Sequence, residues 1–397
     1  MIYLDHNATT RPAPAVVTEM GDALTLAWAN PSSSHEPGLA ARRLLADARL
    51  RVAAFLGCGG AELVFTSGAT EANHTAVLGA LALGRAQGRQ RLLVSAVEHP
   101  ALLALADRLA ADGVPVDRLP VDRRGRLDVD AARTLIGPDV ALVSVMGANN
   151  ETGVCMPIGE LAALAHAAGA LLHVDATQLP GKSAWRFTDS GADLASVSAH
   201  KLHGPKGVGA LLVRKGLALP PLLAGRQERG RRGGTENLPG IAGFAAACDA
   251  TAATLAEDLR RMAALRQRLE DGLRAALPGV HLYGDGAERL PNTSCLRFGD
   301  LPAEQVLGKL ERAGVVASSG AACTASGTQP SHVLLALGES PARAKCGVRF
   351  SLGRETTAAE VEQTLAAARR AIGPLLGLAD AGPAPATASP TAALAAA

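Results

Sequence analysis

The chain has 397 residues, more than one simple hydrophobic core usually supports, so we expect two domains or one large α/β domain with an appendage. Hydrophobic residues make up 48% of the sequence but aromatic residues only 3%, which favours many close-packed helices over an aromatic-rich β-sandwich. The formal net charge is +2, and no long basic stretch occurs outside residues 226–232, so a nucleic-acid partner has little support.

The first residues, MIYLDHNATT, contain neither the basic nor the apolar region of a secretory signal. No apolar run approaches the roughly 20 residues that span a membrane. We therefore expect a cytoplasmic protein with no membrane partner. The cysteines are scattered without a CxxC pair, which indicates neither a structural zinc site nor a disulfide framework. They are Cys58, Cys155, Cys248, Cys295, Cys323 and Cys346, and all but Cys323 are expected to be small buried hydrophobic residues.

Short apolar runs alternate with alanine- and leucine-rich helical stretches through the middle of the chain. The strands that we expect cover residues 92–97, 141–146, 170–174, 194–197 and 208–213. This alternation predicts βαβ units and a mainly parallel sheet with helices on both faces. Polar residues follow several of these strands, where open α/β sheets bind ligands. They are Glu98, His99, Asn149, Asn150, Asp175, Gln178 and residues 198–201.

The sequence also suggests how the chain divides into domains. Residues 16–254 are expected to form a large domain, and residues 1–15 with 255–375 a smaller α+β domain at the C-terminal end. The second part begins with an amphipathic helix from Leu255, in which leucines and Met262 recur at helical spacing. Residues 376–397 are biased toward Ala, Pro and Thr and lack a packing pattern, so we expect a disordered tail.

Lys201 follows an expected strand in SVSAHKLHGPKGVGALLV, where a lysine is most often simply at the surface. Its surroundings favour a cofactor instead. A buried lysine amine can form a Schiff base with pyridoxal phosphate. That cofactor also needs a carboxylate beside its pyridine nitrogen and backbone N–H groups around its phosphate. Asp175 at a strand end meets the first need, and the helix start at residues 68–70 meets the second.

Several stretches of the sequence together resemble the cysteine desulfurases, most closely those of the nitrogen-fixation type. The resemblance runs from the first residues to about residue 375, in the order and spacing of the family. The matching stretches are YLDHNATT, NPSSSH, FTSGATEAN, EHPA, ANNETG, HVDATQ, SAHKLHGPKG, RRGGTEN, SSGAACTASG and VRFSLGRETT.

The resemblance implies a fold-type I enzyme of the class V aminotransferase kind that uses pyridoxal 5'-phosphate and forms a homodimer. Its large domain would hold a mainly parallel seven-stranded sheet, beside a smaller α+β domain. Lys201 would carry the cofactor as a Schiff base, and Asp175 would pair with the pyridine nitrogen. His99 would stack on the ring and act in catalysis, and Arg349 would clamp the substrate carboxylate.

The remaining site residues that the resemblance implies surround the ring and the phosphate. Gln178 would hydrogen-bond the phenolic oxygen of the ring, and Asn150 would contact the cofactor and the substrate. The phosphate would be held by Ala69, Thr70, Ser198 and His200, with Thr235 contributed by the second subunit.

Cys323 lies among small residues in ASSGAACTASGTQPSH, a stretch with little apolar surface to bury and therefore expected to be mobile. The resemblance implies that its thiolate attacks the sulfur of L-cysteine, leaving L-alanine and a persulfide on the enzyme. The long form of this loop is typical of members that hand the persulfide to an iron–sulfur scaffold or another acceptor protein. No intrinsic metal site is expected, although Cys323 could be a transient cluster ligand shared with that scaffold.

The sequence departs from the family pattern in three places. Residues 225–228 are one residue short and lack the usual histidine, which affects the expected geometry of that loop. His6 replaces a customary asparagine, and residues 344–346 replace a segment that usually carries histidine. None of these changes affects a residue with an assigned role.

Two alternatives to a desulfurase acting in iron–sulfur cluster assembly, including nitrogenase maturation, remain open. One is a selenocysteine lyase or another lyase or aminotransferase of the same fold. The other is a non-catalytic scaffold that kept the fold, against which the complete set of catalytic residues argues. The sequence leaves the sulfur acceptor open, between nitrogenase assembly, general cluster assembly and tRNA thiolation.

Overall fold

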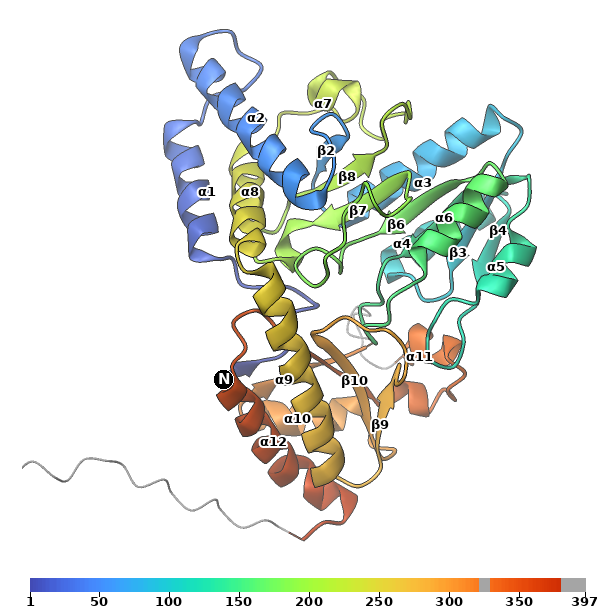
Figure 1. Ribbon diagram of the computed structural model, residues 1–397, viewed down its shortest axis with the longest axis vertical. Helices are drawn as coiled ribbons and strands as arrows, with labels where there is room; N and C mark the ends of the chain where they lie inside the picture. The colour runs from blue at the N-terminus through green and yellow to red at the C-terminus, as the bar shows by residue number, and fades with distance from the viewer. Residues whose placement is uncertain (321–328, 380–397) are drawn as a thin grey trace, which may run out of the picture.

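A seven-stranded sheet forms the centre of the larger part of the computed structural model, which describes residues 1–320 and 329–379 (Figure 1). Within those ranges its strand order is β2-β8-β7-β6-β5-β3-β4, and β8 alone runs in the direction opposite to the other strands. The strands are β2 (Leu63–Thr66), β3 (Arg91–Ser95), β4 (Val116–Leu119), β5 (Val140–Met146), β6 (Leu171–Asp175), β7 (Leu194–Ser198) and β8 (Gly209–Val213). The predicted α/β fold with a mainly parallel seven-stranded sheet is confirmed.

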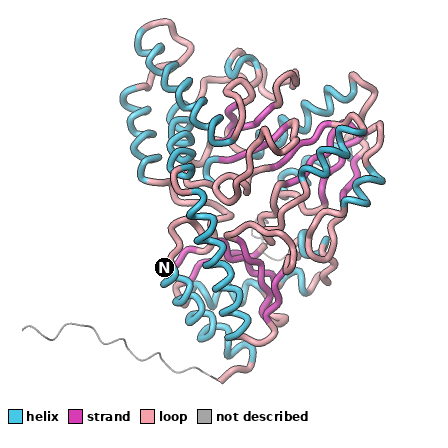
Figure 2. Tube along the Cα trace, viewed as in Figure 1, coloured by secondary structure: helices cyan, strands magenta, loops and turns pink. Residues whose placement is uncertain are grey.

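The central strands are apolar along their whole length because helices cover both faces of the sheet. All of β5, with sequence VALVSVM, is buried. Leu92 and Val94 pack into the core beneath α3 and α4, whereas Leu93 between them packs into the core on the opposite face. Figure 2 shows the strands enclosed by helices. The covering helices are α3 (Ala69–Arg85) and α4 (Pro100–Ala111) on one face, with α5 (Val129–Leu135), α6 (Ile158–Ala167) and α8 (Leu238–Ala252) on the other.

Helix α8 also packs against the first two helices of the chain, α1 (Pro14–Leu26) and α2 (Glu36–Leu56). A short helix, α7 (Gln227–Gly230), precedes it. Among the described residues no single helix is long and apolar enough to cross a membrane, and the pair α8 and α9 (Leu255–Ala276), which passes by length and composition, is bent by 71° at its break.

A second, smaller core lies around a four-stranded antiparallel sheet in the C-terminal part of the described chain. Its order is β12-β13-β10-β9, and leucines 265, 269 and 273 of α9 pack against it. The first residues of the chain belong here too, because β1 (Ile2–Tyr3) pairs with β11 (Val315–Val316). The other elements are β9 (Val280–Tyr283), β10 (Thr293–Phe298), β12 (Ser318–Ser319), β13 (Gly347–Ser351), α10 (Ala303–Arg312), α11 (His332–Ala336) and α12 (Ala358–Ile372).

The packed chain continues past α12. A 3₁₀ turn, η3 (Gly373–Leu376), follows that helix, and the Leu378 amide donates to the Gly373 carbonyl at 3.0 Å. Leu376 and Leu378 pack against the smaller core, so residues at the predicted start of the tail are part of the folded structure. Residues 380–397 of that tail lie outside the described residues.

The start of α12 generates a test of this fold. The Thr357 side chain accepts a hydrogen bond from the Glu360 amide at 3.2 Å, and Glu360 Oε2 accepts one from the Thr357 amide at 2.8 Å. Because Thr357→Ala removes half of this capping box, it should lower the local stability of the first turn by about 1 kcal/mol. Amide hydrogen exchange in α12 measures this. Thr18→Ala, on the exposed face of α1, is the matched control, and equal exchange in both variants would contradict the prediction.

Candidate active site

A cavity of about 540 Å³ lies at the carboxyl ends of the central strands. Its walls come from both parts of the fold, since residues 7–9 and Arg349 join residues of the large sheet and α3. Most of the site residues expected from the sequence line it: Ala69, Thr70, His99, Asn150, Asp175, Gln178, Ser198, His200, Lys201 and Arg349. Cys323 lies outside the described residues.

Lys201 ends a short 3₁₀ turn, η1 (Ala199–Lys201), that continues directly from β7. Its amine donates to two carbonyl oxygens of the N-terminal segment, those of Asn7 at 2.6 Å and Ala8 at 2.8 Å. The segment that reaches the smaller core therefore also positions the lysine.

Asp175 closes β6 and is buried, with both carboxylate oxygens engaged. Oδ2 accepts from Asn73 Nδ2 at 2.8 Å, and Oδ1 accepts from the Thr177 amide at 3.0 Å. Two residues earlier on β6, the His173 ring lies between two serine hydroxyls. Its Nδ1 is 2.8 Å from Ser144 Oγ, and its Nε2 is 2.9 Å from Ser196 Oγ. Burial lowers the pKa of His173 to about 4, so this ring is neutral.

His99 is the N-cap of α4, where its Nδ1 accepts a hydrogen bond from the Ala101 amide at 3.2 Å. Burial lowers its pKa, so the ring is neutral at pH 7 and carries its proton on Nε2. Its neighbour Glu98 is buried, accepting from the Met146 amide at 2.6 Å. Burial raises the pKa of Glu98 to about 8, so this carboxyl group holds a proton.

The start of α3 has the features of an anion site. Its N-cap is Gly68, and among the described residues no side chain caps this end of the helix. A Cβ atom at Gly209 would lie 2.5 Å from the Val197 carbonyl oxygen and 2.8 Å from Gly68 Cα, so the helix start approaches the sheet only because residue 209 is glycine. The side chains of Ser198, His200 and Lys206 line the same cavity.

His200 is held by Thr9, whose hydroxyl is 3.1 Å from its Nδ1. Burial, and then the charge of Lys201, lower its pKa to about 4. A neutral His200 can donate a hydrogen bond to an anion without adding a second charge.

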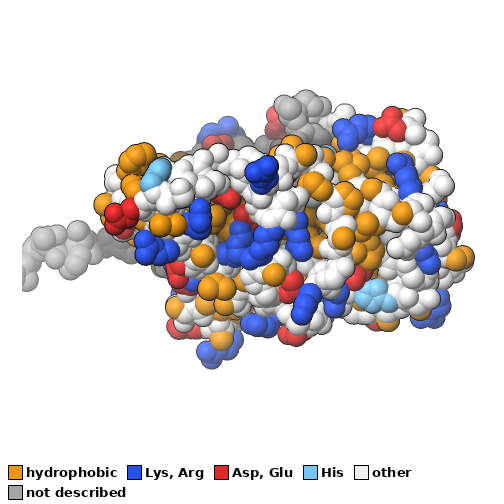
Figure 3. All heavy atoms as spheres, turned by 90° about the horizontal axis from the view of Figure 1, so that it is seen from above, with side chains coloured by type: hydrophobic (Ala, Val, Ile, Leu, Met, Phe, Trp, Pro, Cys, Tyr) orange, Lys and Arg blue, Asp and Glu red, His pale blue; other side chains and the backbone are white. Residues whose placement is uncertain are grey.

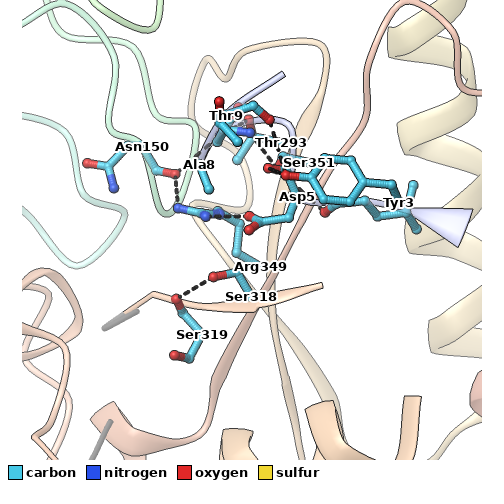
Figure 4. A network of polar contacts seen from close by, with 12 residues as sticks. Tyr3, Asp5, Ala8, Thr9, Asn150, Thr293, Ser318, Ser319, Arg349 and Ser351 are labelled. Atoms are coloured by element: carbon cyan, nitrogen blue, oxygen red, sulfur yellow. Dashed lines mark hydrogen bonds and ion pairs between the residues drawn. The ribbon is translucent and has the colours of Figure 1, made fainter. Parts of the chain in front are cut away.

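Arg349 lies on β13 beside the cavity and is almost fully buried (Figure 4). Its guanidinium pairs with Asp5 Oδ1 at 2.6 Å and donates to the Asn150 carbonyl oxygen at 3.0 Å. Nε has no hydrogen-bond partner within the described ranges. The two contacts orient the guanidinium fork from opposite sides of the boundary between the two cores.

Three residues near the cavity received no role from sequence reasoning: Asn7, Asn73 and Lys182. The Lys182 amine is buried and donates to Asn7 Oδ1 at 3.1 Å and to Gln178 Oε1. Burial lowers its pKa well below that of a free lysine. Asn7 and Asn73 lie inside the quoted stretches YLDHNATT and FTSGATEAN, which was the available signal. Lys182 lies four residues after Gln178 and outside all of them.

Thr235 is exposed and does not line the cavity. It lines a neighbouring hollow that shares Ser67 and Gly207 with the cavity. The structure therefore does not bring Thr235 together with the other site residues within one subunit.

The shortened loop at residues 225–228 has an unusual backbone. Glu228 and Arg229 both have positive φ, at 48° and 60°, which is uncommon outside glycine. Glu228 is held in this conformation from two sides, because its carboxylate pairs with Arg49 and accepts from the Phe65 amide at 2.9 Å. The arginine-rich stretch lies at the end of the molecule seen in Figure 3 and is bound to its own chain, for example Arg232 to Glu71 at 2.9 Å.

The other departures and cysteines lie away from the cavity lining. His6 is buried against His203 and Tyr3. Cys248, Cys295 and Cys346 are buried as expected, whereas Cys58 and Cys155 are only half-buried beside the large core. Among the described residues, no group of three or more His, Cys, Asp or Glu side chains is placed to hold a metal ion.

The chain is similar to known proteins over most of its length. The model of the aminotransferase class-V family matches residues 2–364. A cysteine desulfurase of Rhodobacter capsulatus is 50% identical over 92% of this chain and 94% of its own length. The cysteine desulfurase NifS of Azotobacter vinelandii is 43% identical over 92% of this chain and 90% of its own length.

Solved structures agree with these relatives. A NifS-like protein has a TM-score of 0.87 at 34% identity, covering 94% of this chain and 99% of its own. The protein SspA, solved in complex with cysteine, has a TM-score of 0.78 at 30% identity, covering 90% of this chain and 100% of its own. The chain therefore belongs to the class-V aminotransferase family and, within it, to the cysteine desulfurases.

Proposed function

We propose that this enzyme uses pyridoxal 5'-phosphate to convert L-cysteine into L-alanine, and that the sulfur passes to Cys323 as a persulfide. The observation that carries the proposal is one cavity that holds the Lys201 amine, the doubly hydrogen-bonded Asp175 carboxylate and the uncapped start of α3. These are an amine, a carboxylate and an anion site, the three groups that this cofactor requires.

The residues of the cavity fit the cofactor at each of its polar ends. Asp175 would face the pyridine nitrogen, and Gln178 and Asn150 would face the polar edge of the ring. The phosphate would lie at the start of α3, held by Ala69, Thr70, Ser198 and His200. When bound, the cofactor withdraws electrons from Cα of an amine substrate and so makes its proton removable.

The chain's own residues then handle protons and the substrate carboxylate. Lys201 would carry the cofactor and exchange protons at Cα. His99 would stack on the ring, and its neutral imidazole can pass a proton without the cost of burying a second positive charge. Arg349, already oriented by Asp5 and the Asn150 carbonyl, would bind the substrate carboxylate.

The sulfur transfer balances without an added oxidant or reductant. The C–S bond of cysteine breaks, a C–H bond forms in its place to give alanine, and an S–S bond forms on Cys323. One thiol hydrogen goes to the carbon skeleton and the other stays on the outer sulfur of the persulfide. A thiol reductant or an acceptor protein then removes that sulfur.

We further propose that the enzyme works as a cytoplasmic homodimer that supplies sulfur for iron–sulfur cluster assembly, including that of nitrogenase. Thr235 supports the homodimer, because an exposed residue outside its own subunit's cavity is free to reach the phosphate site of a partner. The similarity to NifS supports the nitrogenase assignment. A nitrogenase gene cluster around this gene would favour it, and tRNA-thiolation genes would overturn it.

Replacing the thiol tests the reaction. Wild type incubated with L-cysteine and a reductant should yield alanine and sulfide. Cys323→Ala should lose this activity because the sulfur has no acceptor, yet should keep the cofactor absorbance, because the groups that hold the cofactor lie elsewhere. Cys58→Ala, which changes a half-buried cysteine beside the large core, is the control and should remain active.

The same variant separates the alternatives. Full cysteine turnover by Cys323→Ala would contradict the proposal. Turnover of selenocysteine by that variant, with no cysteine turnover in wild type, would identify a selenocysteine lyase instead.

Replacing the arginine tests the substrate site. Arg349→Lys loses the planar fork that holds Asp5, the Asn150 carbonyl and a carboxylate together. A lost charge-assisted hydrogen bond contributes roughly 1.5–3 kcal/mol, so KM for cysteine should rise about 10- to 100-fold while the cofactor absorbance stays. Arg297→Lys, a change on β10 outside the cavity, is the control. An unchanged KM in Arg349→Lys would show that the carboxylate binds elsewhere.

A further inference from the structure

Glu151 is a buried carboxyl group next to the cavity that the proposed reaction does not use. It follows Asn150, which lines the cavity, but does not line the cavity itself. Only 2% of the residue is exposed, and its amide donates to Asn149 Oδ1 at 2.9 Å. A buried carboxyl group is costly to keep, so its surroundings are informative.

The chain contacts this one carboxyl group on both sides of the segment 321–328, at Gly320 and at Ser331. On the first side is Gly320, where a Cβ atom would lie 2.0 Å from Glu151 Oε2. A side chain on residue 320 would displace this carboxylate oxygen, so the backbone of residue 320 lies close against the carboxyl group. On the second side, the Ser331 hydroxyl donates to the same oxygen at 2.6 Å.

Each end is also fixed to a part of the fold that reaches the cavity. Before the segment, Ser318 pairs with Arg349 across β12 and β13, and Figure 4 shows Ser318 and Ser319 beside Arg349. After it, the Ser331 hydroxyl accepts from the Leu334 amide at 3.2 Å and so caps α11. His332 Nε2 lies 2.9 Å from the carbonyl oxygen of Glu98, the residue before His99.

The protonation of the Glu151 carboxyl group bears on which substitutions preserve its contacts. Burial raises the pKa of Glu151, and the Ser331 hydrogen bond and the nearby His332 and Arg349 only partly oppose this rise. A protonated carboxyl group has nearly the shape and hydrogen-bonding capacity of a glutamine amide. Glu151→Gln should therefore preserve the contact, and Glu151→Ala should remove it.

We propose that Glu151 is a positioning residue that fixes the described chain on both sides of the segment carrying Cys323, at Gly320 and Ser331, and that sulfur transfer to Cys323 depends on it. This inference rests on the proposed role of Cys323 as sulfur acceptor. We expect it to concern sulfur transfer alone, because Glu151 does not line the cavity.

The test compares two reactions of the cofactor-loaded enzyme. One is alanine formation from L-cysteine, which needs the thiol. The other is exchange of the α-hydrogen of L-alanine with D₂O, which needs only the cavity. Since misplacing a reacting group by about 1 Å can cost about 10²-fold, Glu151→Ala should slow alanine formation by that order and leave exchange within about twofold of wild type.

Two further variants guard against a general loss of structure. Glu151→Gln should restore alanine formation, and Ser331→Ala should reproduce part of the defect of Glu151→Ala. Ser183→Ala, which removes a half-buried serine hydroxyl that is bonded to the Leu179 carbonyl and does not line the cavity, is the matched control and should change neither reaction.

Gly320→Ala provides a second, independent test of the contact between residue 320 and Glu151. The added methyl group collides with the carboxyl group of Glu151, so the change should slow alanine formation strongly in wild type. In the Glu151→Ala background the collision is absent, and the same change should have little further effect.

The outcomes are distinct. The inference would be overturned if Glu151→Ala formed alanine normally, or if it lost both reactions equally. It would also be overturned if the effects of Glu151→Ala and Gly320→Ala on alanine formation were additive. No alanine from wild type would instead overturn the proposed function.

Discussion

The N-terminal segment around Asn7 is the connection on which the rest of the site depends. Asn7 is almost fully buried between the two cores, and its side chain donates to the Asn150 carbonyl at 3.2 Å and to Thr293 Oγ1 at 2.8 Å. Its carbonyl oxygen accepts from Lys201 and Gln178. Its amide donates to Ser351 Oγ on β13 at 2.9 Å, so one residue near the start of the chain contacts both the proposed cofactor lysine and the strand that carries the proposed substrate arginine.

Several other buried polar groups lie behind the side chains that line the cavity. Lys182 holds the side chains of Asn7 and Gln178, the neutral His173 lies beneath Asp175, and the protonated Glu98 precedes His99. Buried groups of this kind cost free energy unless each finds a hydrogen-bond partner. Here Lys182 donates to Gln178 and Glu98 directly precedes His99, and both Gln178 and His99 line the cavity.

Sequence reasoning succeeded where local patterns determine structure and failed where contacts join distant parts of the chain. The apolar runs that became β3, β5, β6, β7 and β8 were predicted within two residues at each end. Strand β4 was missed because, at the edge of the sheet, its sequence VDRL is only partly buried. Lys182 and Glu151 could not be assigned roles from the sequence. Their partners Asn7 and Ser331 lie far away along the chain, and only the fold brings them together. Thr235 stays a prediction that needs a second subunit.

The central claim is that Lys201, in this cavity, holds the cofactor. Reduction of the purified protein with borohydride, followed by peptide mass spectrometry, tests it most directly, because reduction fixes a Schiff base to its lysine. We predict a pyridoxyl group on Lys201. A modification on Lys182, the buried lysine behind the cavity, or no modified lysine at all, would contradict the account.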